Sequence, residues 1–307
     1  NLAGQDTQSY YTIAIGERTG QYNQDINSIA IGGEAGRSNQ GSESIAIGPG
    51  AGGLNQRGIA IGFAAGRSNQ NYGIAIGPYT GNVDQQFQAT AIGFRAAETS
   101  QSTNAIAIGT MAGYSNQGAE SIAIGKESAV IGQEDYAIAV GSKAGSSNQG
   151  SNSIAIGYYA GNSNQSTNAI AIGQNAGFIN QGENGVSIGY EAGMSNQASN
   201  AIAIGHLAGQ STQRFWGIAI GEQAGQYAQN TQSVAIGFQA GMINQHFESI
   251  AIGTASGASN QGGGGIAIGS LAGAVDQEGA TIAIGYYAAE FLQRAYAIAI
   301  GWEAGFS

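Results

Sequence analysis

Ser153 to Gln165 read SIAIGYYAGNSNQ, and nearly the whole chain repeats this phrase. The glycine that closes each IAIG-like unit stands at Gly16, Gly32, Gly48, Gly62, Gly77 and Gly93, and then every sixteen residues from Gly109 to Gly301, which makes nineteen units. A fixed period of this kind is typical of a solenoid, because one repeat cannot bury its apolar face alone. We therefore expect an all-β protein, a parallel β-solenoid of about nineteen stacked coils. It should form a single domain over residues 1–307, uncapped at both ends.

Length changes show where the coil has a surface turn. Two residues are missing between Gly48 and Gly62 and one between Gly62 and Gly77, each time after the Asn-Gln pair. Loops at the surface tolerate such changes. Each coil should therefore have two short straight pieces, IAI and the piece ending at Asn-Gln, joined by a tight GxxAG bend and by a looser turn.

The straight IAI piece alternates large and small side chains. Ile154 and Ile156 flank Ala155, and alternation places both isoleucines on one face of a strand, which we expect to be the dry interior. The central residue is alanine in every unit except that of Ser187, so something must pack closely against it. The candidates are another part of the same coil and a neighbouring protomer. We predict an assembly contact at Ala155, Ala171 and Ala203.

Two further positions are invariant among the nineteen units. The closing glycine, Gly157 in this unit, indicates a backbone angle that only glycine takes easily, or a bend without room for Cβ. The glutamine that ends each unit predicts an amide ladder between coils, with a polar ligand-binding stripe as the alternative. The members we single out for this structural ladder are Gln149, Gln165, Gln181 and Gln197.

Aromatic residues gather one or two positions after the closing glycine, where the units otherwise vary freely. They should line one edge of the solenoid, stacked on one another or on a neighbouring chain. The alternative is contact with a glycan or another surface, because exposed aromatic patches often mark binding. The candidate surface or partner contacts are Tyr158, Tyr159, Tyr190, Phe238, Tyr286, Tyr287 and Trp302.

Composition argues against several classes of function. The net charge is −10, and nine Lys and Arg residues over nineteen units form no basic stripe for nucleic acid. The apolar runs are too short to span a membrane, so the chain should not be membrane-embedded. Without cysteine there are no thiolate ligands, and His206 and His246 lie in different units, too far apart for one metal or a catalytic pair. We expect no catalytic residues, no metal site, no cofactor and no enzyme activity.

The phrase SIAIGxxAG, complete in Ser153 to Gly161 and begun in Ser121 to Gly125, resembles the head repeat of YadA-like trimeric autotransporter adhesins, here with a longer, sixteen-residue period. The resemblance implies a left-handed parallel β-roll and a homotrimer with small residues near the protomer contact. It also implies exposure on a cell or virion surface.

These observations predict a structural extracellular fibre or adhesive rod. Its partner would be itself, through uncapped coil ends in a head-to-tail filament or through lateral contacts between small residues, because an open sheet edge is a template for pairing. The alternative is a homotrimeric adhesin head that binds surface glycans or matrix.

Overall fold

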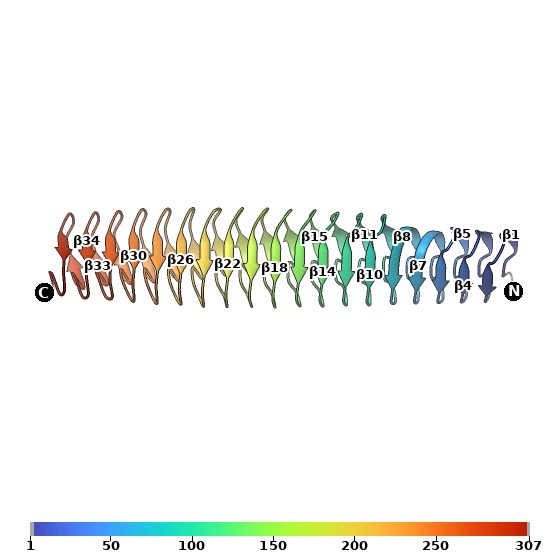
Figure 1. The fold of residues 1–307 in the computed structure, drawn as a ribbon, viewed down its shortest axis with the longest axis horizontal. Helices are drawn as coiled ribbons and strands as arrows, with labels where there is room; N and C mark the ends of the chain where they lie inside the picture. The colour runs from blue at the N-terminus through green and yellow to red at the C-terminus, as the bar shows by residue number, and fades with distance from the viewer. Residues whose placement is uncertain (1–2, 306–307) are drawn as a thin grey trace. The chain divides into compact units, whose positions relative to one another are not determined.

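The computed structural model describes residues 3–305, and the chain is an all-β parallel β-solenoid without a helix in that range. The contacts divide it into two compact units, residues 1–152 and 153–307. In each unit, successive coils lie side by side along the chain (Figure 1). The expected solenoid fold is confirmed, and a single domain over residues 1–307 stays a prediction.

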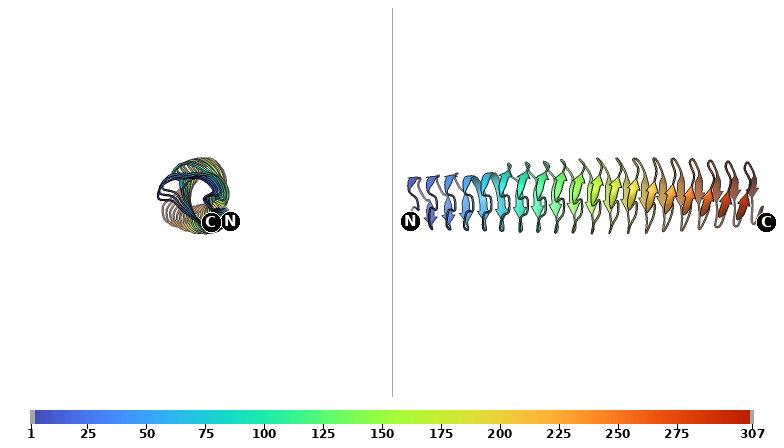
Figure 2. Two further views of the ribbon diagram at one scale, coloured as in Figure 1. Left: turned by 90° about the vertical axis from the view of Figure 1, so that its right-hand side faces the viewer. Right: turned by 180° about the vertical axis from the view of Figure 1, so that it is seen from behind.

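Each regular coil contains two three-residue strands. We call the first the IAI strand and the second, which ends at the invariant glutamine, the Gln strand. Both pair in parallel and in register with their counterparts in the next coil, so that Ala155 lies beside Ala171 and Gln165 beside Gln181. Figure 2, in its right panel, shows the strands of successive coils in such rows. Strict repetition of the sequence therefore places identical side chains directly above one another.

The first unit holds strands β1 to β17. Its IAI strands are β2 (Ile13–Ile15), β4 (Ile29–Ile31), β6 (Ile45–Ile47), β10 (Thr90–Ile92), β12 (Ile106–Ile108), β14 (Ile122–Ile124) and β16 (Ile138–Val140). Its Gln strands are β1 (Asp6–Gln8), β3 (Tyr22–Gln24), β5 (Ser38–Gln40), β9 (Val83–Gln85), β11 (Thr99–Gln101), β13 (Ser115–Gln117), β15 (Ile131–Gln133) and β17 (Ser147–Gln149). Two longer strands, β7 (Leu54–Ile61) and β8 (Ser68–Ile76), combine both types.

The second unit holds strands β18 to β36. Its IAI strands are β18 (Ile154–Ile156), β20 (Ile170–Ile172), β22 (Val186–Ile188), β24 (Ile202–Ile204), β26 (Ile218–Ile220), β28 (Val234–Ile236), β30 (Ile250–Ile252), β32 (Ile266–Ile268), β34 (Ile282–Ile284) and β36 (Ile298–Ile300). Its Gln strands are β19 (Ser163–Gln165), β21 (Ile179–Gln181), β23 (Ser195–Gln197), β25 (Ser211–Gln213), β27 (Tyr227–Gln229), β29 (Ile243–Gln245), β31 (Ser259–Gln261), β33 (Val275–Gln277) and β35 (Phe291–Gln293).

Alanine, not isoleucine, lines the interior of both units. Ala155 is 0% exposed, whereas Ile156 is 39% exposed and Ile154 is half-buried. The expectation that the isoleucines face the interior is therefore wrong. The predicted assembly contact at Ala155, Ala171 and Ala203 is wrong as well, because each is 0% exposed within its own chain. These alanines pack inside their own coils, which was the alternative for the close contact.

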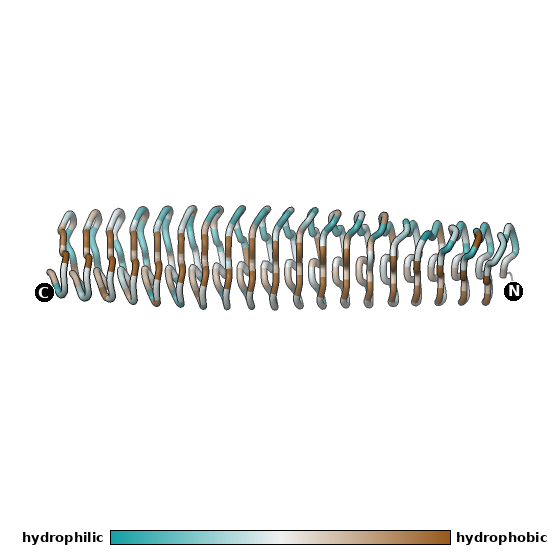
Figure 3. The backbone as a smooth tube through the Cα atoms, viewed as in Figure 1, coloured by the Kyte–Doolittle hydropathy of each residue, from teal (hydrophilic) through white to brown (hydrophobic). Residues whose placement is uncertain are grey.

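The width of the coil explains why alanine points inward. A Cβ placed on Gly161, in the bend, would lie 3.1 Å from the Cβ of Ala155 and 2.6 Å from Oε1 of Gln165. The opposite walls of the coil thus approach so closely that a branched side chain has no room, and protein interiors tolerate overfilling poorly. The apolar colour of the IAI strands in Figure 3 therefore marks isoleucines that lie outside this narrow core.

The closing glycine has both a backbone angle that favours glycine and no room for a Cβ. Gly157 has a φ of 132°, in the region that favours glycine. A Cβ at this position would also lie 2.7 Å from the carbonyl oxygen of Gly173 in the next coil. The bend therefore requires glycine twice over, through its backbone angle and through the close approach of the neighbouring coil.

The two short coils lose the loose turn altogether. In regular coils a turn separates the Gln strand from the next IAI strand, but β7 and β8 continue as strand around this corner. Deletions after the Asn-Gln pair thus convert a turn into continuous strand. Oε1 of Gln40, Gln56 and Gln70 accepts no hydrogen bond here, and the same holds for Gln133, Gln165 and Gln277, which lie in full-length coils.

Candidate functional site: four rows on the solenoid surface and interior

The first row is an exposed isoleucine face, formed by the two branched residues of each IAI strand. In the second unit the second isoleucine of the strand is 36% exposed in five coils, at Ile188, Ile220, Ile236, Ile252 and Ile268. Parallel in-register pairing places these side chains one strand spacing apart, about 4.8 Å. The face is therefore a regular apolar array of the kind that suits packing against another regular surface.

The second row is the internal glutamine row. Gln149, Gln165, Gln181 and Gln197 are at most 1% exposed. Nε2 of Gln165 donates to the carbonyl oxygen of Ile154, across the same coil, at 2.9 Å and to Oε1 of Gln181 at 3.1 Å. Gln181 donates likewise to Gln197 at 3.1 Å, and Gln149 accepts from Gln133 at 3.1 Å. The amides thus link both walls of one coil and successive coils, and their burial leaves no outward stripe for a ligand.

The third row is the aromatic edge, formed by the rings that follow the closing glycine. Tyr158 and Tyr159 meet edge to face with centroids 4.4 Å apart, and so do Tyr286 and Tyr287. Trp302 contacts Tyr286 at 5.9 Å. The hydroxyl of Tyr287 is hydrogen-bonded with Tyr286, which raises the pKa of Tyr287 above its ordinary value of 10.0, an effect reinforced by the neighbouring charges.

The remaining members of this edge stand apart from those two groups. Tyr190 stacks on His206 with centroids 5.3 Å apart, and its hydrogen bond with the Glu191 carboxylate and then that group's charge raise the pKa of Tyr190 above 10.0. Phe238 is 44% exposed. The fold therefore brings all seven predicted aromatics of the second unit to one edge of the coils, in separate small groups instead of one unbroken stack.

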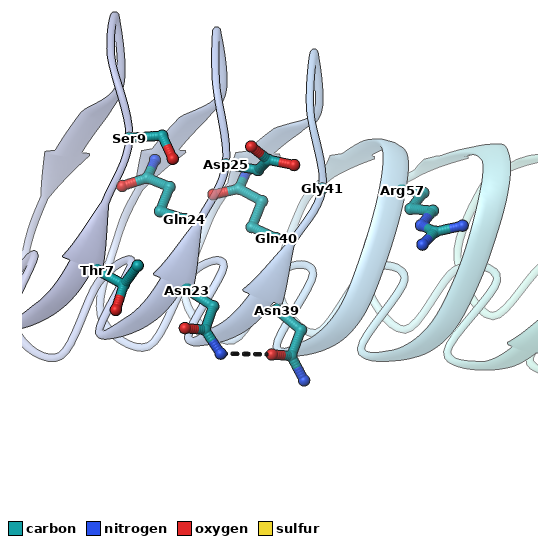
Figure 4. A pocket seen from close by; sticks show the side chains of 9 residues that line it. All are labelled: Thr7, Ser9, Asn23, Gln24, Asp25, Asn39, Gln40, Gly41 and Arg57. Atoms are coloured by element: carbon teal, nitrogen blue, oxygen red, sulfur yellow. Dashed lines mark hydrogen bonds between the residues drawn. The ribbon is translucent and has the colours of Figure 1, made fainter.

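The fourth row, which the sequence reasoning missed, is an external asparagine row. The asparagine that precedes the invariant glutamine points outward, and Nδ2 of Asn23 donates to Oδ1 of Asn39 at 3.0 Å (Figure 4). Asn39 continues to Asn55 at 2.9 Å and Asn55 to Asn69 at 3.1 Å. The frequent Asn-Gln pair was the available signal, since positive φ, 56° at Asn39, favours asparagine.

Aromatic residues in the loose turns were missed as well. Phe215 and Trp216 are 48% and 54% exposed, with ring centroids 5.8 Å apart. In the first unit Tyr72 and Phe87 meet edge to face at 5.8 Å. These rings vary in position from coil to coil, so the repeat pattern did not reveal them.

Within residues 3–305 no three His, Asp or Glu side chains lie close enough to hold a metal ion. No helix in that part of the chain is long and apolar enough to cross a membrane. The four rows are therefore the surfaces and the interior from which a function has to be argued.

Comparison with known proteins returned one match. Residues 134–160 match the model of the YadA head domain repeat, in two copies. Neither the curated proteins nor the solved structures include a significant match to the chain. The matched stretch contains most of the phrase that showed the resemblance, and the sixteen-residue period extends it along the chain. Residues 134–160 are thus similar to YadA head repeats, and they fold as part of a parallel β-solenoid.

Proposed function

We propose that this chain, an adhesin-type repeat protein with YadA-like head repeats, is the structural part of an extracellular adhesive rod or fibre, and that its copies associate through the isoleucine face. The repeat and the solenoid fold are structural rather than catalytic. Exposure on a cell or virion surface is part of the proposal and rests on the resemblance to the YadA repeat.

The observation that carries this proposal is the retention of an exposed apolar residue. Positions just after the closing glycine are exposed and differ from coil to coil, as Tyr158, Gln174 and Glu222 show. Ile220 also lies outside the core, yet its equivalent position holds isoleucine or valine in all of the remaining coils. Internal copies that diverge at one exposed position and not at another indicate that the second makes a contact.

The free energy gained by covering the isoleucine face is large enough for association when many coils take part. Full burial of an isoleucine stabilises by about 1.5–3 kcal/mol, so covering the 36% that Ile220 exposes contributes about 0.5–1 kcal/mol. Ten IAI strands in the second unit, on each of two partners, then contribute about 10–20 kcal/mol. Association costs about 4–15 kcal/mol in lost freedom. A contact over two or three coils is too weak, whereas the full face suffices.

The test replaces three isoleucines of one face by threonine, which keeps β-branching. The variant Ile220→Thr/Ile236→Thr/Ile252→Thr should shift the sedimentation equilibrium toward monomers, with an unchanged far-ultraviolet spectrum. The matched control, Phe238→Ser, alters a varying exposed position and should leave the oligomer intact. A monomeric wild type, or a triple variant that assembles normally, would contradict the role of this face. Retained filaments would instead favour stacking through coil ends.

A second candidate function uses the aromatic edge as a contact for surface glycans or matrix. Tyr158 and Tyr286 are 50% and 48% exposed, and such rings bind the apolar faces of sugars or partner proteins. Changing Tyr158, Tyr159, Tyr286 and Tyr287 together to serine should abolish adhesion to a glycan-coated surface while the oligomer persists. Adhesion that survives this change would remove the aromatic edge from consideration.

A further inference from the structure

The two short coils open a notch in the row of loose turns in the first unit. Regular coils on either side keep their turns, near Ser42 and near Phe87, but β7 and β8 replace the turn by continuous strand. Their registers differ by one residue at this place, where Arg57 pairs with Asn71 and Gly58 pairs with Gly73. Tyr72 is the extra residue, and bulges of this kind commonly re-aim side chains at binding sites.

The notch holds a hollow with an unusual lining. Its volume is about 430 Å³, and apart from Arg57 every residue that lines it carries a side-chain amide: Asn39, Asn55, Asn69, Gln70, Asn71 and Gln86. A second hollow of about 310 Å³ adjoins it at Asn39 and Arg57 (Figure 4). The lining of the larger hollow thus combines many neutral donors and acceptors with one cation and no carboxylate.

The external asparagine row supplies unused hydrogen-bonding groups along this hollow. Within the row, Asn39 and Asn55 each donate one N–H to the amide of the next coil and accept one hydrogen bond from the amide of the previous coil. A primary amide has two donors and two lone pairs, so one of each remains on Asn39 and on Asn55. These groups recur about every 4.8 Å. That spacing is close to the rise per sugar in an extended pyranose chain, whose hydroxyls both donate and accept.

Arg57 is the cationic residue in the lining of the hollow. Its side chain is exposed, and among residues 3–305 it has no carboxylate within ion-pair distance, unlike Arg37 or Arg95. The guanidinium carbon lies 5.9 Å from the ring centroid of Tyr72, which positions it. In the adjoining hollow, the carboxylate of Asp25 already accepts a hydrogen bond from Ser42 at 2.7 Å. The planar donors of Arg57 therefore remain available for a carboxylate from outside.

We propose that this notch binds an acidic polysaccharide, a chain of uronate sugars whose hydroxyls pair with the asparagine row and whose carboxylate pairs with Arg57. The proposal stands on the amide lining, the regular spacing and the unpaired cation. It does not depend on the isoleucine face or on the aromatic edge, so either can fail without affecting it.

The test measures binding of a galacturonate tetramer to the full chain by calorimetry at low salt, beside a neutral galactose tetramer. The wild type should bind the uronate saturably, with affinity falling as salt rises, and the neutral tetramer at least tenfold more weakly. Arg57→Gln should weaken uronate binding at least tenfold. The matched control is Arg214→Gln, because Arg214 also follows the invariant glutamine but lies in a full-length coil.

A second variant tests the notch itself. Inserting Gly-Ser after Gln56 restores the sixteen-residue length and fills the corner with a loose turn, which should abolish binding while Arg57 is retained. Three results would overturn the proposal: no saturable uronate binding by the wild type, equal binding of the neutral tetramer, or equal effects of Arg57→Gln and Arg214→Gln. If the insertion variant does not fold, the comparison of Arg57→Gln with Arg214→Gln still decides whether the uronate binds at the notch.

Discussion

Replacing Gln229 by leucine tests whether the internal glutamine row holds the coils together. Gln229 is 0% exposed and belongs to an unbroken part of the row. Its Nε2 donates to the carbonyl oxygen of Ile218 at 2.8 Å and to Oε1 of Gln245 at 3.1 Å. Its own Oε1 accepts from Nε2 of Gln213 at 2.9 Å. The side chain therefore connects two walls and three successive coils.

Leucine keeps most of the volume of glutamine and removes all of these hydrogen bonds. Nε2 of Gln213 then lacks one acceptor, and the oxygens of Ile218 and Gln245 each lack a donor. A buried polar group left without a partner costs about 1–3 kcal/mol. Gln213 still donates to two carbonyl groups, at 2.7 and 3.0 Å, which places the total near the lower limit. We expect a loss of about 3 kcal/mol in the free energy of unfolding.

The assay is urea unfolding followed by circular dichroism, with hydrogen exchange to show whether protection is lost first in the coils around Gln229. The control is Asn244→Ala, which breaks an amide link of similar length, 3.0 Å, in the exposed external row. Ala228 occupies the equivalent position in the preceding coil with the same sign of φ, so this change should cost about 1 kcal/mol or less. Equal losses for the two variants would refute the reasoning, because burial would then add nothing to the amide link.

Three further changes probe other parts of the coil. Gly221→Ala places a Cβ 2.6 Å from a backbone oxygen of the next coil at a φ of 128° and should cost about 3 kcal/mol or more in thermal unfolding. Gly225→Ala, at a φ of 52°, places its Cβ 2.8 Å from a side-chain oxygen, that of Gln229, and should cost only about 1–2 kcal/mol, because alanine stands at this position in three other coils; similar losses would show that contact with backbone is no worse than contact with a side chain. Ala235→Ser should be nearly neutral in urea unfolding, because serine stands at this position in another coil. Ala235→Val should cost about 1–3 kcal/mol by overfilling the core, and a valine without this cost would show that the core is wider than described. Ser42→Ala should raise the pKa of Asp25 toward its ordinary value of 3.8 in an NMR titration, because the Ser42 hydroxyl is the main cause of the lowered pKa. The stabilisation of the fold by this hydrogen bond is present above pH 3.8 and is lost as the pH falls through the lower pKa of the folded state. An unchanged pKa of Asp25 in the variant would contradict this cause.

Much of the architecture followed from the repeat itself. The sixteen-residue period determined a parallel solenoid, because identical units can bury their surface only against one another. Deletions confined to one corner located the loose turn. The glycine before Tyr158 predicted a bend that excludes a side chain, and the structure shows both a positive φ and a blocked Cβ position there. In each case the signal was local, a residue type kept at one point of the coil.

The orientation of the strand, in contrast, was decided by tertiary structure. Alternation in Ile154 to Ile156 separates two faces but does not say which is inside, and hydrophobicity alone favoured the isoleucines. The coil closes so tightly that only Ala155 and the amide of Gln165 fit between its walls, and this width depends on the approach of the bend to the strand. The same closure turned the isoleucines into an outer face and, where two coils lost their turns, brought Arg57 beside the asparagine row. Such placements depend on distances across the coil, which no single repeat encodes by itself.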